Sequence, residues 1–212
     1  MKLILLGAPG AGKGTQAELL TQQLSIPAIS TGNMLREAMA NGSELGQKVK
    51  KLMDEGSLVP DDVILDIVAD RVSQPDCSRG YILDGVPRTL AQAEALEERG
   101  LSIDHVISIE IDDSVIEGRM TGRRVCSKCG ASYHVVANPP KTEGVCDSCG
   151  EDLVIRKDDA VETVRHRLKV YHELTEVLKD FYQARGKLRL VNGQQSIKGA
   201  NKDILKAIGE QV

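Results

Sequence analysis

Aromatic side chains are scarce in this chain of 212 residues, which has one Phe, four Tyr and no Trp. The hydrophobic fraction of 41% is still enough for a sizeable core, so that core must be built mainly from aliphatic side chains. Basic residues are not in excess, because 27 Lys and Arg stand against 31 Asp and Glu. This balance argues against a general nucleic-acid or anionic-membrane surface, since both require dense patches of Lys and Arg.

Long hydrophobic runs are also lacking. The first apolar stretch, Met1 to Leu6, ends at Gly7 and is too short for a signal-peptide core or a membrane span. We therefore expect a cytoplasmic protein with no membrane partner and no nucleic-acid partner.

The N-terminal part of the chain has the order strand, glycine loop, helix. Lys2 to Leu6 is a short apolar run, and Lys13 to Leu24 has apolar residues at helical spacing. Three further apolar runs, at 80–83, 105–111 and 187–191, are separated by stretches with helical patterns. This alternation predicts an α/β fold with a parallel β-sheet flanked by helices.

Two stretches interrupt the alternation. Residues 30–59 are polar, helical in pattern and punctuated by glycines, which predicts a helical insertion after the second strand. Residues 122–159 are rich in Cys, Gly, Pro and Lys and have almost no aliphatic stripe. A segment below about 40 residues rarely folds alone, so this one needs a staple. The expected domains are a core of residues 1–29, 60–121 and 160–212, the insertion 30–59, and the small segment 122–159.

Four of the five cysteines supply a candidate staple. They form two CxxC pairs, Cys126/Cys129 and Cys146/Cys149, each in a turn that contains glycine, which is typical of a tetrahedral structural metal site. Zinc is the expected ion, and iron in a rubredoxin-like site is the alternative. A catalytic zinc would need an open coordination position, and redox CxxC motifs usually occur singly beside a helix start. Cys77 stands apart, and we expect an inert thiol in or beside the core.

Residues 7–15 read Gly-Ala-Pro-Gly-Ala-Gly-Lys-Gly-Thr, which matches the phosphate-binding P-loop pattern except for Gly14 before Thr15. Glycines let backbone N–H groups converge on phosphate oxygens, and Lys13 supplies a cation for the outer phosphates. Thr15 is expected to help hold Mg²⁺. Asp84 is either a second partner of the Mg²⁺ or a turn cap before Gly85. The motif indicates a nucleoside triphosphate without naming the acceptor.

Five further motifs follow in order along the chain. They are Thr31-Gly-Asn-Met-Leu-Arg36, Gly56-Ser-Leu-Val-Pro-Asp-Asp62, Asp84-Gly-Val-Pro-Arg-Thr89, Gly118-Arg119 to Arg124, and Arg156-Lys-Asp-Asp159. Together with the P-loop they resemble the adenylate kinase family, from Met1 to about Gln195. One departure is Val86, where the family motif usually has Phe. Because that side chain is expected to pack rather than react, we expect altered packing near the AMP pocket and retained activity.

The resemblance implies a monomer with the P-loop kinase fold that transfers a phosphoryl group reversibly from MgATP to AMP, giving two ADP. Residues 122–159 would be its metal-bearing lid. The implied ATP-binding residues are Gly10, Ala11, Gly12, Lys13, Gly14, Thr15, Arg119, Arg123, Ser132, Tyr133 and Gln195. The implied AMP-binding residues are Thr31, Arg36, Ser57, Leu58, Val59, Gly85, Val86, Pro87, Arg88, Gln92, Arg156 and Arg167. The implied catalytic residues are Lys13, Arg88, Arg123, Arg156 and Arg167.

Within these sets the resemblance assigns particular roles. Arg36 and Arg88 would grip the AMP phosphate, and Gln92 would read the adenine edge. Arg119 would stack on the ATP adenine, while Arg156 and Arg167 would bracket the transferred phosphoryl group.

Two other functions are the alternatives. A kinase for CMP or UMP would share the phosphate-binding parts, although Thr31 and Gln92 favour AMP by resemblance. A nucleic-acid-binding or regulatory ATPase would use the cysteines as a zinc ribbon. The basic, aromatic face expected of such a ribbon is absent, because residues 126–149 offer only Lys128, Lys141 and Tyr133.

Overall fold

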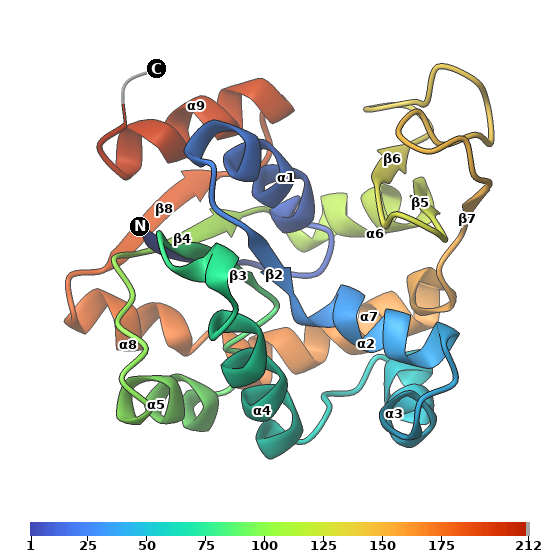
Figure 1. Cartoon of the computed structure of the whole chain (residues 1–212). Helices are drawn as coiled ribbons and strands as arrows, with labels where there is room; N and C mark the ends of the chain where they lie inside the picture. The colour runs from blue at the N-terminus through green and yellow to red at the C-terminus, as the bar shows by residue number, and fades with distance from the viewer. Residues whose placement is uncertain (211–212) are drawn as a thin grey trace.

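The computed structural model describes residues 1–210, and in these residues it has a five-stranded parallel sheet in the order β2-β3-β1-β4-β8 (Figure 1). The strands are β1 (Lys2–Leu6), β2 (Ala28–Ser30), β3 (Tyr81–Asp84), β4 (His105–Glu110) and β8 (Leu188–Asn192). In the register of the sheet, Leu3 lies between Ile82 and His105. The predicted α/β fold with a parallel sheet is therefore confirmed.

Helices cover both faces of the sheet, which explains why its strands are continuous apolar runs. Leu3 and Leu5 point toward one face and pack with α1 (Lys13–Leu24) and α9 (Ile197–Ala207). Ile4 and Leu6 point to the other face and pack with three more helices. Those helices are α4 (Asp61–Val72), α5 (Leu90–Glu98) and α8 (Leu178–Ala184). The side chains in both layers are almost entirely aliphatic, as the composition required.

The insertion 30–59 contains α2 (Thr31–Ala40) and α3 (Glu44–Glu55), which pack tightly against each other. A Cβ atom at Gly46 would collide with the backbone of Ala38, so only glycine allows this approach. Ser43 caps α3, because its hydroxyl oxygen accepts from the Gly46 N–H (3.2 Å) and its O–H donates to the Ala38 carbonyl (2.9 Å).

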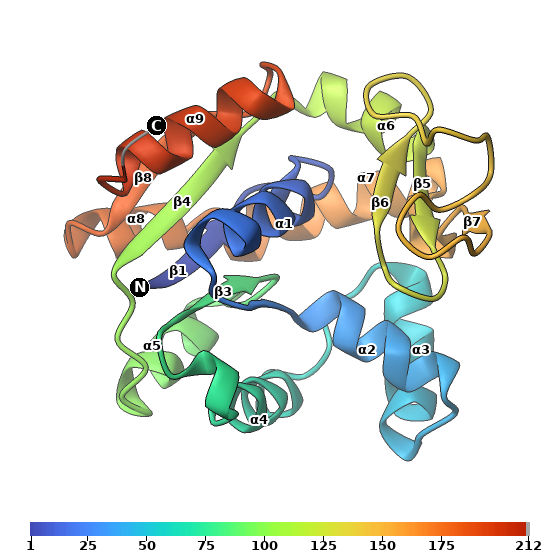
Figure 2. The same ribbon diagram turned by 45° about the horizontal axis from the view of Figure 1, so that its top comes forward.

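A second, antiparallel sheet is formed by the cysteine-rich segment. Its strands are β5 (Arg123–Cys126), β6 (Ser132–His134) and β7 (Leu153–Val154), in the order β6-β5-β7. We call them the lid sheet. The buried cluster of this segment is small, namely Cys126, Tyr133 and Cys146, with Ala131 and Leu153 beside them. Figures 1 and 2 both place the lid sheet and α2–α3 at the same end of the molecule.

The remaining elements connect these parts. They are the short helices η1 (Pro75–Cys77) and η2 (Lys157–Asp159), the helices α6 (Asp113–Thr121) and α7 (Val161–Val170), and the π-helical turn η3 (Tyr171–Thr175). None of the helices in residues 1–210 has the length and apolar character to cross a membrane. The domain boundaries expected from the sequence stay a prediction, and the last two residues of the expected core, 211–212, lie outside the described residues.

Candidate active site

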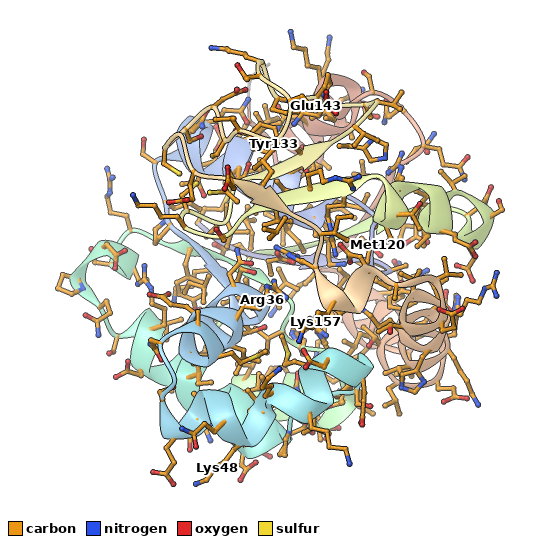
Figure 3. The ribbon with its side chains drawn as sticks, turned by 90° about the vertical axis from the view of Figure 1, so that its right-hand side faces the viewer. Arg36, Lys48, Met120, Tyr133, Glu143 and Lys157 are labelled. Atoms are coloured by element: carbon orange, nitrogen blue, oxygen red, sulfur yellow. The ribbon has the colours of Figure 1, made fainter. Side chains whose placement is uncertain are left out.

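A cleft of about 580 Å³ lies between the core, the insertion and the lid sheet. Figure 3 faces this side of the molecule, with Tyr133 on the lid sheet and Arg36 on the insertion. A cavity of about 70 Å³ adjoins it, lined by both Leu58 and Pro87. Most predicted site residues line the cleft: Gly10 to Thr15, Arg36, Ser57, Gly85, Arg88, Arg119, Arg123, Ser132, Tyr133, Arg156, Arg167 and Gln195.

The P-loop connects β1 to α1 and closes around the ammonium group of Lys13. Lys13 Nζ donates to the carbonyl oxygens of Gly7 (2.6 Å) and Ala8 (2.8 Å). Gly7 has φ +136°, and a Cβ there would lie 2.6 Å from the Ile109 carbonyl oxygen, so the position requires glycine. Burial lowers the pKa of Lys13 to about 8, against the opposing attraction of Asp84.

Arginine side chains converge on the cleft beside Lys13. Burial lowers the pKa of Arg156 to about 9 and that of Arg167 to about 10, and it also lowers the pKa values of Arg36 and Arg88. Arginine rarely loses its charge, so the burial that lowers these pKa values favours an anion beside the guanidinium groups. The carboxylates that attract them are Asp84, Asp158 and Asp159. With Arg123 and Lys13 also present, cations outnumber carboxylates, which suits a polyanionic ligand.

Two acidic residues orient these arginines, although the sequence did not single them out as site residues. The fully buried carboxylate of Asp159 accepts from both Nε (2.8 Å) and Nη2 of Arg123. Asp158 accepts from Arg167 Nη1 through its side chain (2.7 Å) and its backbone carbonyl (3.0 Å). In the sequence, only their position in the Arg-Lys-Asp-Asp motif beside Arg156 points to a role of Asp158 and Asp159 in the site.

A third missed residue is Asn33, on the first turn of α2. Its Oδ1 accepts from Arg36 Nη2 (2.8 Å) and from Arg156 Nη2 (3.4 Å). Arg156 belongs to the segment that follows the lid sheet, so Asn33 joins the insertion to that segment across the cleft.

Arg88 lies in the loop between β3 and α5. Its Nε donates to the Gly85 carbonyl (2.9 Å), which also accepts from Thr31 Oγ1 (3.1 Å). Gly85 has φ +87°, and a Cβ there would lie 2.9 Å from Thr31 Oγ1 and 3.1 Å from Arg88 Nη2. The loop therefore requires glycine where the chain turns toward the cleft.

Four predicted AMP-site residues lie behind the cleft wall instead of lining it: Thr31, Val59, Val86 and Gln92. Val86 is buried in the aliphatic core, as expected for a packing residue. The Gln92 amide is engaged within the protein, because Oε1 accepts from the Arg88 N–H (2.7 Å) and Nε2 donates to Asp61 Oδ1 (2.7 Å). Direct adenine contact by Gln92 stays a prediction.

The far end of the cleft is lined by Arg119 and Gln195. Arg119 Nη2 donates to the Gly193 carbonyl (2.8 Å), and Gln195 Nε2 donates to Asp203 Oδ2 (2.7 Å). Tyr133 forms part of the lid wall, and its hydroxyl accepts from the Asp147 N–H (2.8 Å).

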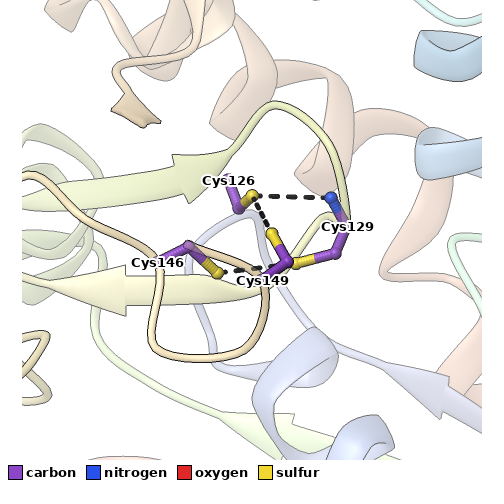
Figure 4. A group of neighbouring side chains, drawn as sticks. All are labelled: Cys126, Cys129, Cys146 and Cys149. Atoms are coloured by element: carbon purple, nitrogen blue, oxygen red, sulfur yellow. Dashed lines mark hydrogen bonds between the residues drawn. The ribbon is translucent and has the colours of Figure 1, made fainter. Parts of the chain in front are cut away.

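The four cysteines of the two CxxC pairs lie together at the tip of the lid sheet (Figure 4). Their sulfur atoms are within 4.8 Å of one another, with Cys126 and Cys149 3.4 Å apart and Cys129 and Cys146 3.5 Å apart. Four sulfurs at about 2.3 Å from one tetrahedral zinc would be separated by about 3.8 Å. The group therefore fits a four-thiolate metal such as zinc.

His134 lies beside Gly122 and is not part of this group. Its Nδ1 accepts from the N–H groups of Val136 and Ala137 (both 3.1 Å). The ring thus holds the turn after β6.

A P-loop, two segments that flank it and a cleft with excess cations define a phosphoryl-transfer enzyme of the P-loop class. The family model for adenylate kinase matches residues 5–187. Proteins named adenylate kinase from Caldicellulosiruptor bescii, Caldicellulosiruptor saccharolyticus and Acetivibrio thermocellus are 56%, 54% and 51% identical to the chain, covering 99%, 99% and 98% of both sequences. The chain belongs to the adenylate kinase family.

The resemblance seen in the sequence is thereby confirmed, and so are the activity and the enzyme class that it implied. The protein is a nucleoside monophosphate kinase that transfers a phosphoryl group reversibly from MgATP to AMP, giving two ADP. Its substrates are ATP, AMP and ADP.

Proposed function

We propose that the cleft divides into two nucleotide sites that meet at Lys13. The ATP site would consist of residues 10–15, Arg119, Arg123, Ser132, Tyr133 and Gln195. The AMP site would consist of Thr31, Arg36, residues 57–59, residues 85–88 and Gln92. The observation that supports this division is the group of buried cations in the cleft, which includes Lys13 of the P-loop and Arg36 of the insertion, whereas Arg119 lines the cleft without a charged neighbour among them.

The chemistry follows from the charges. The acceptor is a phosphate oxygen of AMP that is already ionised at neutral pH, so no strong general base is needed. The barrier lies in bringing two polyanions together in line. Lys13, Arg88, Arg123, Arg156 and Arg167 would neutralise that charge, and the planar guanidinium groups would hold phosphate oxygens in a bidentate geometry.

Asp158 and Asp159 have a supporting role in this scheme. They fix the directions of Arg167 and Arg123 before substrate arrives. Preorganised cations need no reorientation during the reaction, so they stabilise the charge of the transition state without a reorganisation cost.

Mg²⁺ would be held by the ATP phosphates together with the oxygens of Thr15 and Asp84, both of which line the cleft. Oxygen donors are the ligands that Mg²⁺ prefers, so these residues fit the ion. When bound, Mg²⁺ supplies positive charge to the phosphates. The four cysteines would hold a structural Zn²⁺, which leaves no coordination position for catalysis.

The zinc would make residues 122–159 a rigid lid that closes over ATP and excludes water, turning near Gly122 and residues 158–160. A side chain at Gly122 would collide with the His134 ring, so this hinge position requires glycine.

We propose further that the enzyme acts as a cytoplasmic monomer, with no nucleic-acid or membrane partner.

An acceptor assay tests the proposed function. Purified protein is mixed with MgATP and AMP, CMP or UMP in turn, and nucleoside diphosphates are quantified. AMP is expected to be the preferred acceptor, with two ADP formed for each ATP consumed. Preferred turnover of CMP or UMP, or release of inorganic phosphate stimulated by nucleic acid, would contradict it.

A further inference from the structure

A π-helical turn interrupts the long helical segment that carries Arg167. It spans Tyr171–Thr175, and the Glu176 N–H donates to the Tyr171 carbonyl (2.9 Å), which is the i to i+5 bond of this turn. Such turns are rare and occur often at functional sites. Nothing in the division of the cleft described above accounts for it.

The turn changes which face of the helix Thr175 occupies. In an ideal α-helix, residues eight positions apart, such as Arg167 and Thr175, are about 80° out of phase. A π turn takes more residues per revolution and reduces this offset. Arg167 and Thr175 accordingly line the same small cavity, together with Arg88.

Thr175 makes a specific contact there. Its side chain is buried, with 8% of the residue exposed, and its Oγ1 donates to the Arg88 carbonyl (2.7 Å). On the other side, the Arg88 N–H donates to Gln92 Oε1 (2.7 Å). Arg88 thus has both backbone polar groups held by side chains from two different helices, although its own loop has no regular structure.

We propose that Thr175 is a positioning residue for Arg88 and that the π turn brings its hydroxyl to the Arg88 carbonyl. The contact ties the Arg88 loop to the helix that carries Arg167. The two guanidinium groups are thereby held at a fixed separation, which in-line transfer between two phosphates requires. This inference rests on the proposed role of Arg88 in binding the AMP phosphate.

The test compares Thr175→Val, which keeps the shape but removes the hydroxyl, with Thr175→Ser, which keeps the hydroxyl. The matched control is Thr21→Val, because Thr21 Oγ1 in α1 is buried and has no hydrogen-bond partner among residues 1–210. Initial rates are measured against AMP and MgATP separately, with the melting temperature of each variant.

We expect Thr175→Val to lower kcat/KM for AMP about fivefold or more, the loss typical of one hydrogen bond, with KM for MgATP unchanged. Thr175→Ser should stay near the wild-type value, and Thr21→Val should leave both substrates unaffected. Three results would overturn the inference: AMP kinetics within twofold of wild type in Thr175→Val, an equal loss for both substrates, or the same loss in Thr175→Ser.

Arg88→Ala separates this inference from the proposed function. If Arg88→Ala leaves the KM for AMP unchanged, the proposed role of Arg88 is wrong. If Arg88→Ala impairs AMP use while Thr175→Val does not, only the positioning role of Thr175 is wrong.

Discussion

Replacement of Lys13 by Met is expected to stabilise the nucleotide-free protein at pH 7 while it abolishes catalysis. The ammonium group is drawn from water into the P-loop, which lowers its pKa from 10.5 to about 8. The unfolded chain therefore holds this proton more firmly than the folded protein does. A lysine with a lowered pKa destabilises the fold fully below pH 8, and the penalty disappears as the pH rises toward 10.5.

The magnitude follows from the shift and the contacts. A change from 10.5 to about 8 corresponds to about 3 kcal/mol, an upper value because Lys13 is only partly shielded from solvent. Met would also lose the two hydrogen bonds to the Gly7 and Ala8 carbonyls, worth about 1 kcal/mol each. A net gain of about 1 kcal/mol at pH 7 remains. At pH 9.5 the cost of burying the Lys13 charge is smaller by about 2 kcal/mol than at pH 7. Its removal by Met then no longer outweighs the two lost hydrogen bonds, so the variant should be less stable than wild type.

Urea unfolding at pH 7 and pH 9.5, with zinc present and nucleotide absent, measures these differences. Lys179→Met is the matched control, because Lys179 pairs with Glu110 (2.7 Å) and Glu176 (3.0 Å) and these partners raise its pKa. The ion pairs of Lys179 stabilise the folded protein at pH 7, so Lys179→Met should lower the free energy of unfolding at that pH. A Lys13→Met variant whose stability relative to wild type does not change between the two pH values would refute the reasoning.

Two further predictions concern the loop before Arg88 and the lid sheet. Gly85→Ala should lower the free energy of unfolding by about 1–3 kcal/mol and raise the KM for AMP, because an alanine at φ +87° would be strained and crowded against Thr31 Oγ1. Urea unfolding and initial rates check this, and wild-type values for both would contradict it. Cys149→Ser, or chelation of the metal, should expose the lid sheet to hydrogen exchange while β1 and β4 stay protected. Unchanged protection of the lid sheet would show that the metal does not hold it.

The central sheet was predictable because burial on both faces leaves a strong mark on a sequence. The predicted strand at Lys2 to Leu6 and the predicted helix at Lys13 to Leu24 coincide with β1 and α1. The strand before the insertion had no predicted range, since Ala28–Ser30 is too short to show a pattern. The π turn at Tyr171–Thr175 was also invisible, because one extra residue in a turn barely changes hydrophobic periodicity.

The cleft residues that belong to sequence motifs were predictable. The roles that depend on contacts between residues far apart in the sequence were not. The P-loop and the arginines predicted as site residues do converge. The roles of Asn33 and Asp159 depend on partners far along the chain, which spacing cannot reveal. The burial of Gln92 behind Arg88 likewise depends on Asp61, 31 residues away.

Steady-state kinetics of Arg88→Ala and Arg119→Ala test the division of the cleft most directly, with KM measured for AMP and for MgATP in each variant. Arg185→Ala is the control, because Arg185 is exposed just after α8 and pairs with Glu97 away from the cleft. The account predicts that Arg88→Ala raises the KM for AMP about tenfold or more and that Arg119→Ala raises the KM for MgATP, each leaving the other substrate within about twofold. Equal effects of both variants on both substrates, or the reverse assignment, would contradict it.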